Sequence, residues 1–206
     1  LNGTSEGNFL INNFGASNDN NTYTNNSITK VRFGITSSGI SSTSPNQNTL
    51  INNNIVGPST FGSDEIGRGG IMLCYENNAT VSGNEVRFVG ERATQTISST
   101  SDRVGIYLGT NAAFWPGTDA YVGNTKVTGN IIHDIVSERP TGSTTRSAVG
   151  IVVAVDNGGN PTNNIIANNM IYNIRSNSNV STGTGAPDQT IGIGLNGGNK
   201  DLVAYN

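Results

Sequence analysis

Charged side chains are scarce in this sequence, because 11 basic and 14 acidic residues make up only 12% of its 206 residues. No basic cluster is present, so the chain lacks the electrostatic footprint of a protein that binds nucleic acid or anionic membranes. Apolar residues account for 33% of the chain. No stretch approaches the roughly 18 apolar residues that span a bilayer. The sequence therefore predicts no nucleic-acid partner and no membrane span in this segment.

Cysteine and histidine occur once each, as Cys74 and His133. A lone cysteine cannot form an internal disulfide, and one cysteine with one histidine makes a zinc site improbable. Asp, Asn and turn carbonyls are oxygen ligands that favour Ca²⁺, but no spacing matches an EF-hand or the acidic nonapeptide repeat. We predict no metal and no cofactor, with Ca²⁺ as the alternative.

Neutral polar residues dominate instead, with 32 Asn and 27 Gly. Both residue types tolerate a positive φ, and Asn can hydrogen-bond to its own backbone, so this composition suits repeated tight turns. A chain with so few apolar residues would remain disordered unless they were arranged in a regular pattern. The pattern therefore decides between disorder and a fold.

Two elements repeat along the chain. In the first, Gly precedes alternating apolar residues, and the members are Gly7-Asn8-Phe9-Leu10, Gly34-Ile35, Gly70-Ile71, Gly105-Ile106, Gly150-Ile151 and Gly192-Ile193. In the second, Asn lies three residues after one apolar residue and two before another. Its asparagines are Asn26, Asn53, Asn84, Asn130, Asn169 and Asn206, the last in an incomplete copy. The average period is about 37 residues, inside the range of solenoids and propellers.

Alternation of apolar and polar residues within each short element predicts strands whose alternate side chains face inward. We expect one buried row of Ile35, Ile71, Ile106, Ile151 and Ile193, and a second of Ile28, Ile55, Val86, Ile132 and Ile171. Asparagines at one corner of successive coils would form a side-chain ladder. Replacing Asn130 of this ladder by alanine would cost about 1 to 3 kcal/mol. A propeller is the rival fold, but it needs about four strands per repeat with aromatic markers.

This pattern resembles the parallel β-helix repeat that pectate-lyase-like enzymes share with many large surface proteins, and the resemblance covers essentially the whole chain. It implies an all-β fold, a right-handed parallel β-helix of about five to six coils. We expect residues 1–206 to form a single β-helix domain. Neither end offers a helix that would cap the last coil, and because solenoids cap their open edges, we expect further coils or domains in a longer parent chain.

Arg87, His133 and Tyr172 are the candidate catalytic residues. Each lies one residue after the buried aliphatic residue of its repeat, and the three repeats are consecutive. Thr29 and Val56 hold the same position in the two preceding repeats. Stacking would therefore bring Arg87, His133 and Tyr172 side by side. Arg87 could neutralise a uronate while His133 acts as a general base. The competing interpretation is that they merely decorate an outer wall, in which case His133→Ala costs under about 0.5 kcal/mol. The outward row of the Gly-Ile element, Thr36, Met72, Tyr107, Val152 and Gly194, contains no acid or base.

Trp115, Asp119 and Tyr121 are the candidate ligand-binding residues, because aromatic rings beside a carboxylate can stack on a sugar and bind its hydroxyls. The competing interpretation is that they pack a long loop onto the coil. If the chain were an inverting hydrolase, two carboxyls about 6.5 to 9.5 Å apart would be needed.

The preferred functional interpretation is non-enzymatic: a segment of a large exported cell-surface or adhesin-like protein, secreted or displayed on the surface, acting as a rigid stalk or as a glycan-binding solenoid. Its Asn, Thr, Ile and Gly bias is similar to that of very large type IX secreted surface proteins. This similarity implies a polysaccharide or cell-surface glycan and the secretion machinery as partners. The alternative is a polysaccharide lyase or glycoside hydrolase of the β-helix type, including the tailspike kind.

Overall fold

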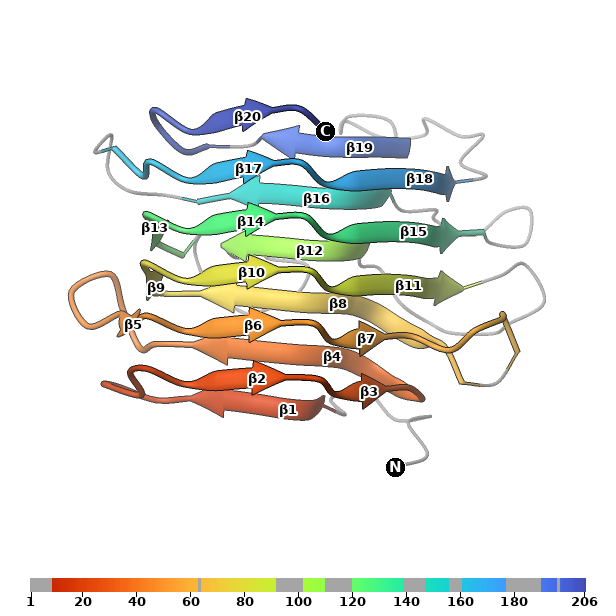
Figure 1. The fold of residues 1–206 in the computed structure, drawn as a ribbon, viewed down its shortest axis with the longest axis horizontal. Coiled ribbons are helices and arrows are strands. Elements are labelled where there is room, and N and C mark those ends of the chain that lie inside the picture. The colour runs from red at the N-terminus through yellow and green to blue at the C-terminus, as the bar shows by residue number, and fades with distance from the viewer. Residues whose placement is uncertain are drawn as a thin grey trace, which may run out of the picture.

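The computed structural model describes residues 9–62, 64–91, 102–109, 120–138, 147–155, 161–176, 190–195 and 197–206. These residues form strands and no helix, and so the described ranges hold no helix suited to crossing a membrane. Every pairing between named strands is parallel. The strands stack in chain order from one end of the molecule to the other (Figure 1). The prediction of an all-β fold is confirmed, and the long parallel sheets are consistent with a parallel β-solenoid.

Three sheets make up the stack. The six-stranded sheet contains β2 (Thr22–Thr24), β6 (Leu50–Asn52), β10 (Thr80–Ser82), β14 (Lys126–Thr128), β17 (Ile165–Ala167) and β20 (Leu202–Ala204). The three-stranded sheet contains β5 (Asn46–Gln47), β9 (Glu76–Asn77) and β13 (Val122–Gly123).

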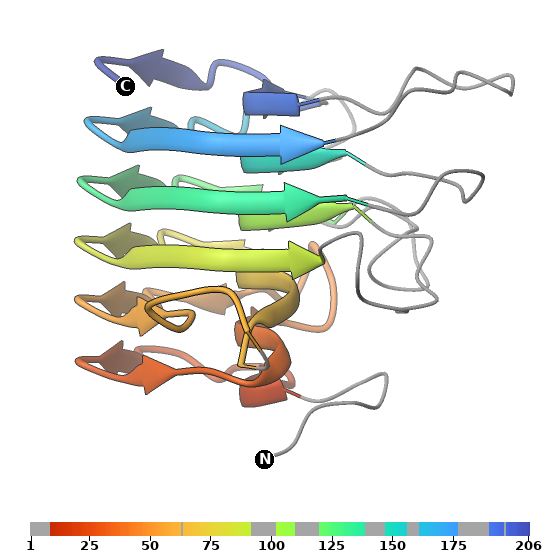
Figure 2. The same cartoon turned by 90° about the vertical axis from the view of Figure 1, so that its right-hand side faces the viewer.

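The 11-stranded sheet has two rows of strands, joined where β8 pairs with β11. The first row contains β1 (Phe9–Phe14), β4 (Val31–Ser38), β8 (Ile66–Cys74), β12 (Arg103–Gly109), β16 (Ala148–Ala154) and β19 (Thr190–Leu195). The second contains β3 (Ser27–Ile28), β7 (Ile55–Val56), β11 (Glu85–Glu91), β15 (Ile131–Ser137) and β18 (Met170–Ser176). Figure 2 shows the long strands of the second row lying one above another.

The first predicted core row is confirmed: Ile35, Ile71, Ile106, Ile151 and Ile193 are paired in register on successive strands. The second row is also present, but its member on β7 is Val56, which pairs with Ile28 and Val86. The prediction of Ile55 was wrong by one residue. Because side chains alternate along a strand, this shift places Ile55 on the outer face, where it is 38% exposed.

The predicted asparagine ladder is present, but its second member was also wrong by one residue. Asn54, not Asn53, takes the place between Asn26 and Asn84. Each Asn donates from Nδ2 to the Oδ1 of the next, over 2.8 to 2.9 Å, along the row Asn26, Asn54, Asn84, Asn130, Asn169 and Asn206. The backbone N–H of each donor residue reaches the same oxygen. The ladder therefore satisfies backbone and side-chain groups together.

Left-handed backbone conformation recurs at three fixed positions of the repeat. Measured from Val127 of β14, these positions lie three residues before (Asn124), two after (Gly129) and seven after (Asp134). The first position holds Asn20, Asn48, Asn78, Asn124, Asn163 and Lys200, the second Asn25, Asn53, Gly83, Gly129, Asn168 and Tyr205, and the third Lys30, Phe88, Asp134 and Asn173. Asn and Gly are the residues that adopt this conformation most easily. The Asn-rich composition is thus explained by the corners of the stack.

The repeated Gly before Ile is explained by close packing between the two rows. A Cβ added at Gly105 would lie 2.6 Å from the carbonyl oxygen of Gly150 and 2.5 Å from Cγ2 of Ile132. Comparable clashes would arise at Gly34, Gly70 and Gly150. Only glycine leaves room for one strand row to contact the next, so the Gly-Ile signature marks where the core is narrowest.

The outward-facing residues of the first strand row are in register as expected, but the first three of them are not at the surface. Thr36, Met72 and Tyr107 are each 1% exposed, and Met72 and Tyr107 belong to a second apolar cluster with Phe33 and Val104. These side chains are packed on the outer side of the sheet. This face is a second core, which explains why the row contains no acid or base.

Candidate functional site

The second strand row brings together the three residues predicted from the repeat. Arg87 of β11 pairs with His133 of β15, which pairs with Tyr172 of β18. The expected neighbour Val56 does not belong to this column, since it pairs with the buried Val86. The backbone of Gly57 takes the place next to Arg87 and leaves no space for a Cβ. Stacking therefore creates a wall in which a cation, an imidazole and a phenol follow one another.

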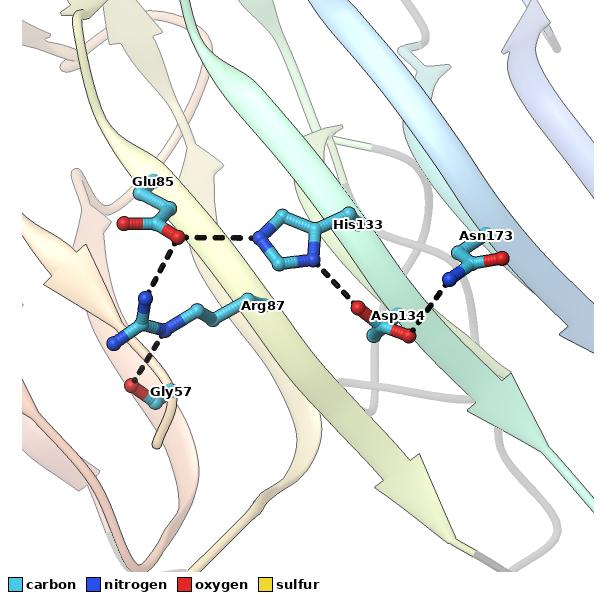
Figure 3. A network of polar contacts seen from close by, with 6 residues as sticks. All are labelled: Gly57, Glu85, Arg87, His133, Asp134 and Asn173. Atoms are coloured by element: carbon cyan, nitrogen blue, oxygen red, sulfur yellow. Dashed lines mark hydrogen bonds and ion pairs between the residues drawn. The ribbon is translucent and has the colours of Figure 1, made fainter. Parts of the chain in front are cut away.

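Two carboxylates, which sequence reasoning named only as near neighbours, complete this cluster. Glu85 Oε1 accepts a hydrogen bond from Arg87 Nη1 (2.7 Å) and lies 3.2 Å from His133 Nε2. His133 Nδ1 lies 2.6 Å from Asp134 Oδ2, and Asp134 Oδ1 accepts from Asn173 Nδ2 over 3.1 Å. Figure 3 shows these contacts running across three strands. We call the side chains of Glu85, Arg87, His133, Asp134 and Tyr172 the His133 wall.

The contact between His133 and Asp134 depends on a corner of the backbone. Adjacent residues of a regular strand point to opposite faces, but Asp134 has φ of 54°. The left-handed conformation interrupts the alternation and lets both side chains lie on the same side. The predicted period of two could not reveal this contact, although the Asn173 and Phe88 positions share the same conformation.

Aromatic contacts hold the imidazole in place as well. The His133 ring is stacked on Tyr172, with centroids 4.8 Å apart and planes 2° apart. On its other side Phe88 meets it edge-on at 5.9 Å and also contacts Phe61. His133 is only 8% exposed, whereas Tyr172 is 44% exposed. Tyr172 lies on β18, the last strand of this row in the described part of the chain, so its ring is the exposed end of the wall and stacks on His133.

The electrostatics of the wall are largely balanced internally. Burial alone would raise the pKa of Glu85, but hydrogen bonds from His133 and Arg87 and their charges outweigh it, so the pKa lies below its usual value. Glu85 is therefore held as a carboxylate that already has two partners. Both ring nitrogens of His133 face carboxylates, so neither is directed toward an incoming substrate. This arrangement suits rigid recognition better than proton abstraction.

Two of the three residues of the second predicted site, Trp115 and Asp119, lie outside the described residues. Tyr121 is described, and its hydroxyl donates to Asn77 Oδ1 over 3.0 Å. Burial raises the pKa of that hydroxyl. Tyr121 thus contacts the β9 corner through its hydroxyl.

Sequence reasoning missed a second, exposed row of asparagines. Asn78 Nδ2 donates to Asn48 Oδ1, and Asn48 Nδ2 donates to Asn20 Oδ1, over 2.7 and 3.0 Å. Asn163 Nδ2 reaches Asn124 Oδ1 at 3.5 Å, but the row is interrupted there, because Asn124 Nδ2 donates to Asn77 Oδ1 and not to Asn78. The signal was available, because each of these residues lies three positions before a residue of the six-stranded sheet. Being exposed, the row contributes regularity to the corner more than stability.

No metal-binding cluster of three or more His, Cys, Asp or Glu side chains is found among the described residues. In the comparisons with known proteins, no family model, curated protein or solved structure matches this chain. The function therefore has to be argued from the wall itself.

Replacing His133 by alanine is expected to lower the free energy of unfolding by about 1 kcal/mol, because it removes two hydrogen bonds and a stacked ring. This corrects the sequence-based value of under about 0.5 kcal/mol, which assumed a solvent-exposed side chain. Urea denaturation of the variant beside the exposed control Thr29→Ala measures the difference. A loss no larger than that of the control would mean that the ring contacts contribute nothing.

Proposed function

We propose that this chain is a segment of an exported cell-surface protein, a right-handed parallel β-helix of the pectate-lyase-like kind, and that its His133 wall binds a glycan without cleaving it. The right hand rests on the general preference of parallel β-crossovers. The neutral Asn-, Ser- and Thr-rich composition and the low charge support export to the cell surface, with the type IX machinery as the proposed exporter. Stacked coils would hold the binding wall at a distance from the cell.

The observation that carries this proposal is a half-exposed aromatic ring stacked on the end of a hydrogen-bonded network. Tyr172 is 44% exposed and stacks on His133, while Asp134 lies on the neighbouring strand β15 and Arg87 one strand further away, on β11. Sugars are recognised by rings that contact their apolar C–H faces and by polar side chains that bind their hydroxyls. Because the network fixes the side chains before any ligand arrives, little conformational entropy is lost on binding.

Replacing Tyr172 by alanine is expected to weaken glycan binding at least about tenfold, which corresponds to roughly 1.4 kcal/mol. The experiment screens the wild-type chain against immobilised polysaccharides and then measures the affinity of Tyr172→Ala by titration calorimetry with the oligosaccharide found. Tyr172→Phe should retain most of the affinity, because the ring face remains. Phe14→Ala is the control, since Phe14 is a 57% exposed aromatic residue on β1, at the opposite end of the stack.

The same incubations distinguish a binding module from an enzyme. Each polysaccharide is analysed for new reducing ends and for unsaturated products after exposure to the chain. Turnover by the wild type that disappears in His133→Ala or Arg87→Ala would replace binding by the lyase or hydrolase alternative. Absence of binding to any glycan would reject the proposed function altogether.

A further inference from the structure

A groove runs along one corner of the stack, directly beside the His133 wall. It has a volume of about 260 Å³ and is lined by Asn53, Asn54, Ile55, Gly83, Asn84, Glu85, Gly129 and Ile131. Its floor is the buried ladder, since Asn54 and Asn84 are each 1% exposed. Glu85 belongs to the groove and to the wall at once, so the two features are continuous.

The groove exists because two corner positions have no side chain. Gly83 and Gly129 occupy the second left-handed column, which in other copies of the repeat holds Asn25, Asn53 and Asn168. A Cβ added at Gly129 would meet no atom within 4 Å. Packing therefore does not demand glycine at this position, and its conformation is one that asparagine adopts three times in the same column. The open space at Gly129 is therefore not a requirement of the fold, whereas a Cβ added at Gly83 would lie 2.6 Å from Asn53 Oδ1.

The sides of the groove combine exposed apolar groups with polar ones. Ile55 is 38% exposed and Ile131 41% exposed, and they pair with Glu85 from either side in the same column. The two apolar side chains would contact a sugar ring on its C–H face, while the Glu85 carboxylate between them would accept hydrogen bonds from its hydroxyls. A volume below the roughly 300 Å³ of the smallest drug-sized pockets suits a small ring.

The charges beside the groove select among glycans. Arg87, the cation of the wall, is already bound by Glu85, and Asp134 adds a second carboxylate beside His133. Because Arg87 and both ring nitrogens of His133 already face these two carboxylates, a uronate carboxylate would meet two anions whose partners are taken, and it would be repelled rather than neutralised. Carboxylates that accept hydrogen bonds from sugar hydroxyls suffer no such repulsion. The balance favours an uncharged sugar.

We propose that the ligand of the His133 wall is a neutral polysaccharide, and that the chain runs along the stack and places one sugar residue in the groove at Gly83 and Gly129. This inference rests on the proposed function and deepens it. It replaces the uronate suggested by the sequence with a neutral glycan, and it adds Ile55, Ile131 and the two glycines to the binding surface.

The test fills the groove without disturbing the fold. Gly129→Asn introduces the residue that the same column holds at Asn168, and its melting temperature should equal that of the wild type. Calorimetry compares wild type and variant with neutral oligosaccharides of glucose, mannose and galactose and with oligogalacturonate. We expect the wild type to prefer a neutral oligosaccharide, and Gly129→Asn to weaken that binding at least tenfold. Asn168→Gly, the reverse change outside the groove, should bind as the wild type does.

Each outcome bears on one claim. Unchanged binding by Gly129→Asn, together with the loss in Tyr172→Ala, would overturn the groove while leaving the wall as a glycan site. Tighter binding of oligogalacturonate than of any neutral oligosaccharide would overturn the choice of ligand. Binding of none of these oligosaccharides by the wild type would overturn this inference. Only a failure of the wild type to bind any polysaccharide in the wider screen would reject the proposed function itself.

Discussion

Alanine at position 130 is expected to lower the free energy of unfolding by about 3 kcal/mol, because Asn130 lies in the middle of the buried ladder. Its Oδ1 accepts from the backbone N–H and the Nδ2 of Asn84, and its Nδ2 donates to Asn169 Oδ1 and to the carbonyl oxygen of Val81. Asn130 is 1% exposed, so water cannot replace these partners in the intact fold. Each buried polar group left without a partner costs about 1 to 3 kcal/mol.

Chemical denaturation followed by circular dichroism measures this loss, and two variants calibrate it. Asn52→Ala removes an amide from the outer face of β6, where the contact with Ser82 Oγ is 3.3 Å long, and should cost under about 0.5 kcal/mol. Asn26→Ala lies at one end of the ladder and is only partly buried, so its effect should fall between the two. A cost for Asn130→Ala equal to that of Asn52→Ala would show that the ladder does not support the stack.

The ladder also illustrates what the repeat pattern could and could not predict. The triplet Asn52-Asn53-Asn54 fits an apolar–Asn–apolar frame in two ways, through Leu50/Asn53/Ile55 or Ile51/Asn54/Val56. The two frames differ by one residue, and in a strand such a shift exchanges the buried and exposed faces. Gly83 and Gly129, which precede the ladder residue in two other copies, favour the second frame, because that preceding position is left-handed. The glycines, rather than the asparagines, therefore identify the correct frame.

The His133 wall was predictable only in part. Its column of Arg87, His133 and Tyr172 follows from the register of the repeat, because identical spacing must align these residues on adjacent strands. The contact with Asp134 was not predictable from alternation, since it depends on a left-handed residue within the strand. The groove was likewise hidden, because it results from missing side chains on two consecutive copies and not from any motif.

Glutamine at position 76 is expected to stabilise the protein by about 2 kcal/mol at pH 8 and to have little effect at pH 4. Glu76 of β9 is 0% exposed, and burying an ionised carboxylate is costly unless it is paired with a cation. Burial raises its pKa, and hydrogen bonds from Ser37 Oγ (2.6 Å) and Asn46 Nδ2 (3.2 Å) offset only part of that effect. The amide of glutamine can accept the same two bonds without carrying charge.

The sign of the pH dependence follows from the raised pKa. The folded state holds the proton of Glu76 more tightly than the unfolded chain, so its contribution is fully present below the unfolded value of about 4.3. That contribution is lost as the pH rises through the folded pKa. The stability of the wild type should therefore decline relative to Glu76→Gln from weakly acidic pH upward. Thermal unfolding of both proteins between pH 4 and pH 8 measures the divergence.

Glu85 supplies a comparison of opposite sign within the same molecule. Its pKa is lowered by its bonds to His133 and Arg87 despite the opposing effect of burial, so its carboxylate stabilises the fold above the unfolded value and the benefit disappears as the pH falls. Glu85→Gln should hence destabilise the protein near neutral pH and lose its effect in acid, by under about 1 kcal/mol because the site is partly exposed. Parallel pH profiles for the two variants would contradict the view that Glu76 is buried without a counter-charge among the described residues while Glu85 is held by cationic and hydrogen-bonding partners.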